Sequence, residues 1–244
     1  FFQQTESFAF FDELRTKLDN QGIQRGKKEY AQHCRLLLQT LLHSPGLNYA
    51  NLPKGLITFH RYPDHVRTPL EEQTHEGIAY ARDETGIVRL HFTVSAEHEP
   101  LMREHMTKIE QRIKCHNIQL HLTFSHQVPS TDTIAVEPSN HLFRDASGKL
   151  VFRPGGHGAL LNNLRSLQGD IVFIKNIDNV LPEHLVNQPN QYKKAIGGYI
   201  VAVQQQIFSY LDILSQKQVS INTLRELFEF AKATLGTTIP PSRE

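Results

Sequence analysis

The middle of the chain alternates between strand-like and helix-like segments, and this order restricts the possible fold more than any other feature. Strand candidates rich in β-branched and aromatic residues cover 55–60, 88–94, 118–124 and 170–174. Helix candidates lie between them at 69–82, 99–116 and 159–167. Repeated strand–helix–strand order predicts an α/β fold with a mixed, mostly parallel sheet and helices on both faces.

Helical segments frame this alternating region. Residues 7–18 and 28–43 have amphipathic patterns, and Tyr30, Cys34 and Leu41 recur at helical spacing. A hairpin is expected at 143–152, and two long helices at about 190–215 and 220–235. We therefore expect a helical segment over 1–50, an α/β core over 51–185 and C-terminal helices over 186–244.

The composition limits the partners that the chain can have. Its 26 Lys and Arg and 25 Asp and Glu leave a net charge of +1, which does not indicate a nucleic-acid or membrane surface. No apolar run reaches the roughly 18 residues of a membrane span. Cys34 and Cys115 lack a Cys-x-x-Cys spacing, so we expect both to stay reduced in a cytoplasmic protein. Because Phe1 stands where Met would, we expect the chain to begin within a longer protein.

The first candidate for a binding site is the turn Arg153-Pro-Gly-Gly-His-Gly158 between a strand and a helix. Its glycines allow close approach of the backbone to a ligand and positive φ angles. A helix that follows such a turn offers free N–H groups to an anion. The alternative is a tight turn without a ligand, in which His157 acts as a local cap.

The second candidate is the apolar strand 171–174, which runs into Lys175-Asn-Ile-Asp-Asn179. Ligands of open α/β sheets bind at the carboxyl ends of the strands, and the loops there are 95–97, 125–127 and 175–179. Asp178 would then lie at a strand end and face residues 155–158 across one cleft, where a carboxylate can hold Mg²⁺ between phosphates. The alternative is an Asx-turn that ends the strand.

The third candidate is a group of cations. Lys54, Arg61 and Arg67 fall within one short stretch and could bind phosphate, although solvated surface charges give the same pattern. The 14 histidines lack the His-Glu-x-x-His spacing of zinc proteases. No Gly-x-Ser-x-Gly turn occurs, so a serine hydrolase is also disfavoured.

Taken in order, these segments resemble motifs of the UDP-sugar pyrophosphorylases. Pro154-Gly-Gly-His-Gly158 looks like their glycine-rich turn, and Phe173-Ile-Lys-Asn-Ile-Asp-Asn179 looks like their strand that ends in Asn-Ile-Asp-Asn. Weaker similarities lie at 91–98, 124–129 and 54–55. The resemblance covers about residues 52–180 and implies a Rossmann-like nucleotidyltransferase (GT-A-like) fold. The whole chain also resembles an uncharacterised bacterial family known as a domain of unknown function.

The resemblance implies a binding site for a nucleoside triphosphate, with UTP preferred, and for a sugar 1-phosphate. Gln127 would contact the nucleotide base, and Gly155 and Gly156 would present their backbone to the nucleoside. His157 would contact the sugar phosphate or the ribose, and Asn176 would contact the sugar.

The resemblance also implies a catalytic pair and a metal. Asp178 would hold Mg²⁺ and the phosphates, and Lys54 would neutralise phosphate charge. The reaction would be an in-line attack of the sugar phosphate on the α-phosphorus, with release of pyrophosphate and no covalent enzyme intermediate.

One family feature does not appear in this sequence. These enzymes carry a Gly-Gly-x-Gly-Thr-Arg-type loop ahead of the phosphate lysine, whereas residues 1–53 contain only Gly22, Gly26 and Gly46. Two alternatives therefore remain open. One is a non-catalytic protein that binds nucleotides or sugar phosphates, and the other is a metal-dependent glycosyltransferase, which normally needs an Asp-x-Asp motif that is missing here.

Overall fold

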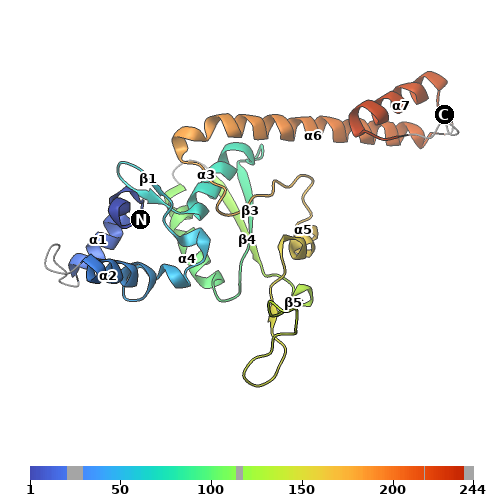
Figure 1. Ribbon diagram of the computed structural model, residues 1–244. Helices are drawn as coiled ribbons and strands as arrows, with labels where there is room; N and C mark the ends of the chain where they lie inside the picture. Colours follow the sequence, from blue (N-terminus) through green and yellow to red (C-terminus); the bar gives the residue numbers. More distant parts are fainter. Residues whose placement is uncertain (21–29, 114–117, 217, 239–244) are drawn as a thin grey trace. The chain divides into compact units, whose positions relative to one another are not determined.

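The computed structural model describes residues 1–20, 30–113, 118–216 and 218–238. Contacts divide the chain into two compact units, Phe1–Val186 and Asn187–Glu244 (Figure 1). The strands of the described residues all belong to the first unit, together with two apolar core clusters. This unit is therefore a mixed α/β structure, whereas the second is helical.

Two parallel strands form the centre of the first unit (Figure 1). In β3 (Ile87–Thr93) and β4 (Gln119–Ser125), the register pairs Ile87 with Gln119 and Thr93 with Ser125. Helix α4 (Glu99–Ile113) lies between them in the chain, as parallel neighbours require a crossover connection. The strands predicted at 88–94 and 118–124 and the helix predicted from 99 are confirmed. The predicted end of that helix, at 114–116, lies outside the described residues.

One face of this sheet is apolar and carries both α3 (Pro69–Tyr80) and α4. Their shared core consists of Leu70, Met102, Met106, Ile109 and Ile113, and strand side chains such as Phe92, Leu122 and Phe124 pack against it. Helix α3 comes especially close at Gly77, where an added Cβ would lie 2.6 Å from Leu90 Cδ2. The missing side chain at this position lets the helix approach β3.

The opposite face of the sheet carries no second layer of helices from the described residues of the first unit. Arg89, Thr93, His121 and Thr123 point to this face and are exposed. Parallel strands covered on both sides are apolar throughout, so the alternation of polar and apolar residues along β4 favours a single covered face. Each sheet of the described residues has two strands, and the larger Rossmann-like sheet is not present in this part of the chain.

Helix α3 begins with a capping box. The Thr68 hydroxyl accepts a hydrogen bond from the Glu71 amide, and the Glu71 carboxylate accepts one from the Thr68 amide at 2.8 Å. Pro69 occupies the first helical position, where its missing N–H costs nothing. The predicted N-cap is therefore confirmed, and the helix ends at Tyr80 rather than at 82.

Two of the predicted strands are wrong. Instead of a strand at 55–60, the chain forms the 3-10 helix η3 (Lys54–Leu56) and then β1 (His60–Arg61), which pairs with β2 (Val66–Arg67) in an antiparallel hairpin. Residues 170–174 have an irregular backbone, and the Ile174 side chain is 73% exposed. A short apolar run is compatible with a strand but does not specify a neighbouring strand to pair with.

The N-terminal region contains two helices close to the predicted ranges 7–18 and 28–43, although residues 28 and 29 lie outside the described residues. It comprises η1 (Phe2–Ser7), α1 (Phe11–Asn20), α2 (Tyr30–Leu42) and η2 (Tyr49–Asn51). Leu14 from α1 packs with Leu37 and Leu41 from α2 and with Leu47 in a core of its own. The i, i+4 spacing of the α2 leucines explains why they share one buried face.

Residues 129–165 form a smaller substructure in the first unit. After η5 (Pro129–Thr131), the short strands β5 (Thr133–Ile134) and β6 (Phe152–Arg153) pair in an antiparallel arrangement. An isolated bridge between Arg144 and Leu150 forms the predicted hairpin. The helix predicted at 159–167 is divided into η6 (His157–Leu160) and α5 (Leu161–Arg165). The unit ends with η7 (Glu183–Leu185).

The second unit consists of α6 (Asn187–Leu214) and α7 (Ile221–Leu235), which confirm the two predicted C-terminal helices. The aromatic rings of Tyr210 and Phe230 lie 5.2 Å apart between them. Ser220 caps the start of α7, and Gly236 ends it in a left-handed conformation with φ of 64°. Among the described residues, no helix combines the length and apolar character needed to cross a membrane.

Candidate functional site

Lys54 and Asp178 form an ion pair between residues 124 positions apart in the chain. Lys54 opens η3 directly after Pro53, and Asp178 lies in a turn that is closed by a 3.1 Å hydrogen bond from the Asn179 amide to the Asn176 carbonyl. The Lys54 and Asp178 side chains are 57% and 34% exposed. The ammonium group of Lys54 holds the pKa of the Asp178 carboxyl below its usual value, so Asp178 carries a full negative charge at neutral pH.

Asp178 does not follow a strand as predicted, because the segment before it is irregular. Side-chain contacts with α3 hold this segment in place instead. Lys175 forms a 2.6 Å ion pair with Glu76, and Gln73 donates from Nε2 to the Asn176 carbonyl at 2.9 Å. Asn176, which the resemblance assigns to the sugar, is exposed and lies two residues before Asp178 in the sequence.

The glycine-rich turn brings together a second group of predicted residues. An added Cβ on Gly155 would lie 2.7 Å from the Thr131 carbonyl and 3.6 Å from Gln127 Nε2, so Gly155 and Gln127 are neighbours. Gly156 has open space around it, with φ of −69° and ψ of −172°. His157 begins η6 with an exposed side chain.

Two expectations for this turn are corrected. The glycines with positive φ in the described residues are Gly86, Gly148 and Gly236, so the turn does not depend on left-handed backbone. Close approach to the Thr131 carbonyl is instead what requires a glycine at 155. The helix that follows also has little dipole to offer an anion, because α5 is only five residues long.

Polar side chains near the carboxyl ends of β3 and β4 connect to both groups, and three of these residues were not predicted. His98 Nδ1 forms a 2.7 Å hydrogen bond with Ser95 Oγ. His98 Nε2 lies 3.2 Å from the carbonyl oxygen of Asn51, a residue that lies just before η3 in the chain. Glu99 lies 2.5 Å from His126 Nε2. The available signal was position in the sequence, because both residues lie shortly after the strand predicted at 88–94 and Glu99 begins the helix predicted from 99.

Asn163 is the third missed residue, and it attaches α5 to the end of β4. Its Nδ2 donates to Ser125 Oγ and to the His126 carbonyl, both at 2.7 Å. The glycine-rich turn therefore lies near the carboxyl end of β4, and the loop before Lys54 contacts the start of α4. No hydrogen bond or ion pair joins the two groups directly within the part of the chain that the structure describes.

Metal binding here would depend on Asp178 and on the ligand itself. Among the described residues, no group of three His, Cys, Asp or Glu side chains has the arrangement of a metal site. Mg²⁺ needs only one or two carboxylates when substrate phosphates supply further oxygens. A single ionised, partly exposed carboxylate beside a lysine fits that mode of binding, and it does not fit a site made by the protein alone.

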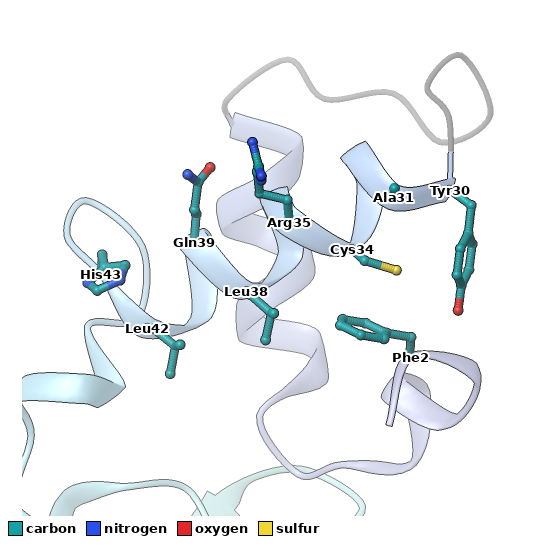
Figure 2. A pocket seen from close by; sticks show the side chains of 9 residues that line it. All are labelled: Phe2, Tyr30, Ala31, Cys34, Arg35, Leu38, Gln39, Leu42 and His43. Atoms are coloured by element: carbon teal, nitrogen blue, oxygen red, sulfur yellow. The ribbon is translucent and has the colours of Figure 1, made fainter.

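A cavity of about 540 Å³ lies elsewhere in the first unit, between η1 and α2. Figure 2 shows Phe2 opposite Cys34 and Leu38 across this cavity. Its lining comes from Phe2 and from residues 30–43, and none of the predicted site residues contributes to it. The cavity is therefore separate from the candidate site.

Comparison with known proteins identifies a family but no characterised relative. A search of curated proteins and a search of solved structures each found no match. A family model, by contrast, matches residues 1–244. The chain therefore belongs to the family described as "Domain of unknown function (DUF4301)".

Proposed function

We propose that the chain contributes to the active site of a sugar-1-phosphate nucleotidyltransferase that uses UTP. The observation that carries this proposal is the Lys54–Asp178 contact, which brings a cation and a carboxylate together from distant positions. Both residues stand where the resemblance implies a phosphate lysine and a metal-binding aspartate. Because both side chains are partly exposed, Lys54 could leave Asp178 to bind a phosphate of the ligand, and Asp178 could then bind its metal ion.

In the proposed reaction, an oxygen of the sugar phosphate attacks the α-phosphorus of UTP. The bond from that phosphorus to the bridging oxygen breaks, and pyrophosphate leaves with the electron pair. Bound Mg²⁺ would supply positive charge to the triphosphate. Asp178 would hold the metal ion, and Lys54 would move from Asp178 to a phosphate oxygen. Positioning and charge neutralisation would supply the rate enhancement.

The second group of residues would bind the organic parts of the substrates. Gln127 would contact the base, while the backbone at Gly155 and Gly156 would lie against the nucleoside. The open space beside Gly156 supports this role, because a ligand can approach the backbone there. His157 and Asn176, both exposed, would contact the sugar phosphate and the sugar.

The experiment is a pyrophosphate-release assay with UTP, Mg²⁺ and a panel of sugar 1-phosphates, together with calorimetry of Mg²⁺–UTP binding. We expect Asp178→Asn to lower turnover by about 100-fold or more, because it removes the metal-binding charge while preserving shape. Lys54→Ala should weaken nucleotide binding by about 1.5–3 kcal/mol through loss of a charge-assisted hydrogen bond.

Asp145→Asn is the matched control. Asp145 accepts hydrogen bonds from the Ser147 and Lys149 amides at 2.8 and 3.0 Å in an exposed turn, and asparagine can form the same Asx-turn. This variant should keep the parent's activity. If Asp178→Asn also keeps it, Asp178 only forms a turn and the proposed role is wrong.

The alternative is a binding protein without catalytic activity, and Gly46 favours it. This glycine is one of the few before Lys54, and an added Cβ would lie 1.8 Å from the Thr40 carbonyl. The turn that follows α2 is therefore sufficient reason for a glycine at position 46. Gly22 and Gly26 lie outside the described residues. Binding of Mg²⁺–UTP without release of pyrophosphate would support this alternative.

A further inference from the structure

We propose that Gln73 and Glu76 of α3 are positioning residues that fix Asp178 relative to Lys54. Neither residue was singled out by the sequence, and neither would touch a substrate. This proposal rests on the proposed function only for the role of the Lys54–Asp178 pair in binding metal and phosphate. The positioning of Asp178 depends on contacts within the chain and can be tested without a substrate.

The first contact is the ion pair of Glu76 with Lys175, three residues before Asp178. Their atoms lie 2.6 Å apart, and the side chains are only 4% and 19% exposed. A lysine that binds substrate needs an accessible ammonium group, whereas that of Lys175 lies against a buried carboxylate. Separating this pair is unfavourable, because a buried charge is costly when it loses an oppositely charged partner. Lys175 is therefore suited to anchor its segment.

The second contact comes from Gln73, one helical turn before Glu76 and on the same side of α3. Its Nε2 donates to the Asn176 carbonyl at 2.9 Å and to the Ile177 carbonyl at 3.4 Å. These bonds hold the backbone and do not depend on the side chains of the segment. Together, the two α3 residues restrain three consecutive residues of a segment that lies outside the strands of the described residues.

These restraints reach both members of the ion pair. The Asn176 carbonyl that accepts from Gln73 also accepts from the Asn179 amide, which closes the turn around Asp178. The Ile177 side chain lies over Gly55, where an added Cβ would be 3.3 Å from Ile177 Cγ1. Gly55 directly follows Lys54. A shift of the segment would therefore move Asp178 and also separate Ile177 from Gly55, the neighbour of Lys54. Such a shift matters because catalytic groups tolerate displacements of only about 0.5 Å.

The test is hydrogen exchange of the Asn179 amide in the full chain, measured for Glu76→Gln and Gln73→Ala. Both variants should raise its exchange rate about tenfold or more, while the amides of β3 and β4 keep the parent's rates. Gln73 is only half-buried, so Gln73→Ala should fold even if Glu76→Gln does not. Unchanged exchange at Asn179 in the folded variants would overturn the proposal.

Glu71→Gln is the matched control, because Glu71 is also a buried glutamate of α3 but contacts Thr68, Arg112 and His105 instead. Glutamine can keep the capping hydrogen bond to the Thr68 amide. It should leave exchange at Asn179 unchanged. Equal acceleration in this control would mean that any loss of a buried carboxylate loosens the turn, which contradicts specific positioning.

Calorimetry of Mg²⁺–UTP binding to the same proteins separates this proposal from the proposed function. We expect weaker binding in Glu76→Gln and Gln73→Ala, and parent affinity in Glu71→Gln. If the parent itself does not bind Mg²⁺–UTP, the proposed function fails, while the exchange rates still decide the positioning role. Parent affinity in variants whose turn has loosened would show that the turn does not position the binding groups.

Discussion

At the scale of single residues, His91 orders a series of hydrogen bonds along the polar face of the sheet. Asn163 donates to Ser125 Oγ at 2.7 Å, which leaves the Ser125 proton for His91 Nε2 at 2.8 Å. His91 Nδ1 lies 2.8 Å from Thr123 Oγ1, whose own proton is directed to the Leu90 carbonyl at 3.5 Å. All of these donors find acceptors when the imidazole is neutral and protonated on Nδ1.

This arrangement predicts a pH dependence of stability. Burial lowers the pKa of His91 below 6.5, so between the two values the unfolded chain binds more protons than the folded one. Stability should therefore fall as the pH drops from 6.5 through the folded-state pKa, with no effect above 6.5. Urea unfolding at about pH 7.5 and about pH 5 measures this. His91→Gln should lose less stability on acidification than the parent, and an equal loss would assign the effect to other histidines.

Two adjacent glycines should respond differently to the same substitution. Gly155→Ala places a methyl group 2.7 Å from the Thr131 carbonyl and should destabilise the protein by about 1–3 kcal/mol. Gly156→Ala meets open space and should change stability by less than about 0.5 kcal/mol. Urea denaturation distinguishes them, and equal losses would show that the close approach at Gly155 is not what requires glycine. If a nucleoside lies against Gly156, Gly156→Ala should still weaken its binding.

The sequence could identify residues of the candidate site but not their contacts. Lys54 and Asp178 were each recognisable from local motifs, and Gln127 and Gly155 likewise. No local signal relates residues that lie 124 positions apart, so the ion pair depends on tertiary structure. Gln73 and Glu76 were missed because a helix pattern does not show which buried polar residue will meet which loop.

At the scale of elements, prediction succeeded where the element's own residues determine it. Thr68 and Pro69 mark the start of α3 through local hydrogen bonding and φ restriction, and period-2 alternation marks β4. It failed at 55–60 and 170–174, where an apolar run is compatible with several conformations. Pairing to a neighbouring strand decides between them, and those segments are not paired as continuous strands.

The packing of α3 on β3 can be tested at Gly77. Alanine at this position favours the helix by about 1 kcal/mol, but its methyl group would lie 2.6 Å from Leu90 Cδ2. We expect the clash to dominate, with a net loss of about 1–2 kcal/mol in the free energy of unfolding. Leu90→Ala removes the clashing atoms, so the double variant should lose less than the sum of the two single losses. Simple additivity would mean that Gly77 does not set the distance between helix and strand.

At the scale of the whole molecule, the buried apolar residues are unevenly distributed. Both core clusters lie within Phe1–Val186, whereas α6 exposes large apolar residues along much of its length, such as Tyr199, Phe208 and Leu211. Hydrophobic burial is the main stabilising contribution in folding. The first unit therefore contains both buried apolar clusters of the described residues.

A fragment comprising residues 1–186 should accordingly fold without the second unit. We expect a cooperative urea transition with protected amides in β3 and β4, as in the full chain, because no member of either core cluster is removed. Circular dichroism and hydrogen exchange measure this. Loss of protection in β3 and β4 would show that the second unit supports the sheet.

The distances in sequence between contacting residues also predict an order in which the structure forms. The β3–β4 ladder joins residues only 32 positions apart, whereas the Glu76–Lys175 and Lys54–Asp178 contacts close loops of 99 and 124. Because longer loops cost more entropy to close, we expect the sheet and its helices to form first and the candidate site to assemble on a core that is already folded. Contacts made after the rate-limiting step affect unfolding more than folding. Substitutions in residues 175–178 can therefore change the site without altering how fast the protein folds.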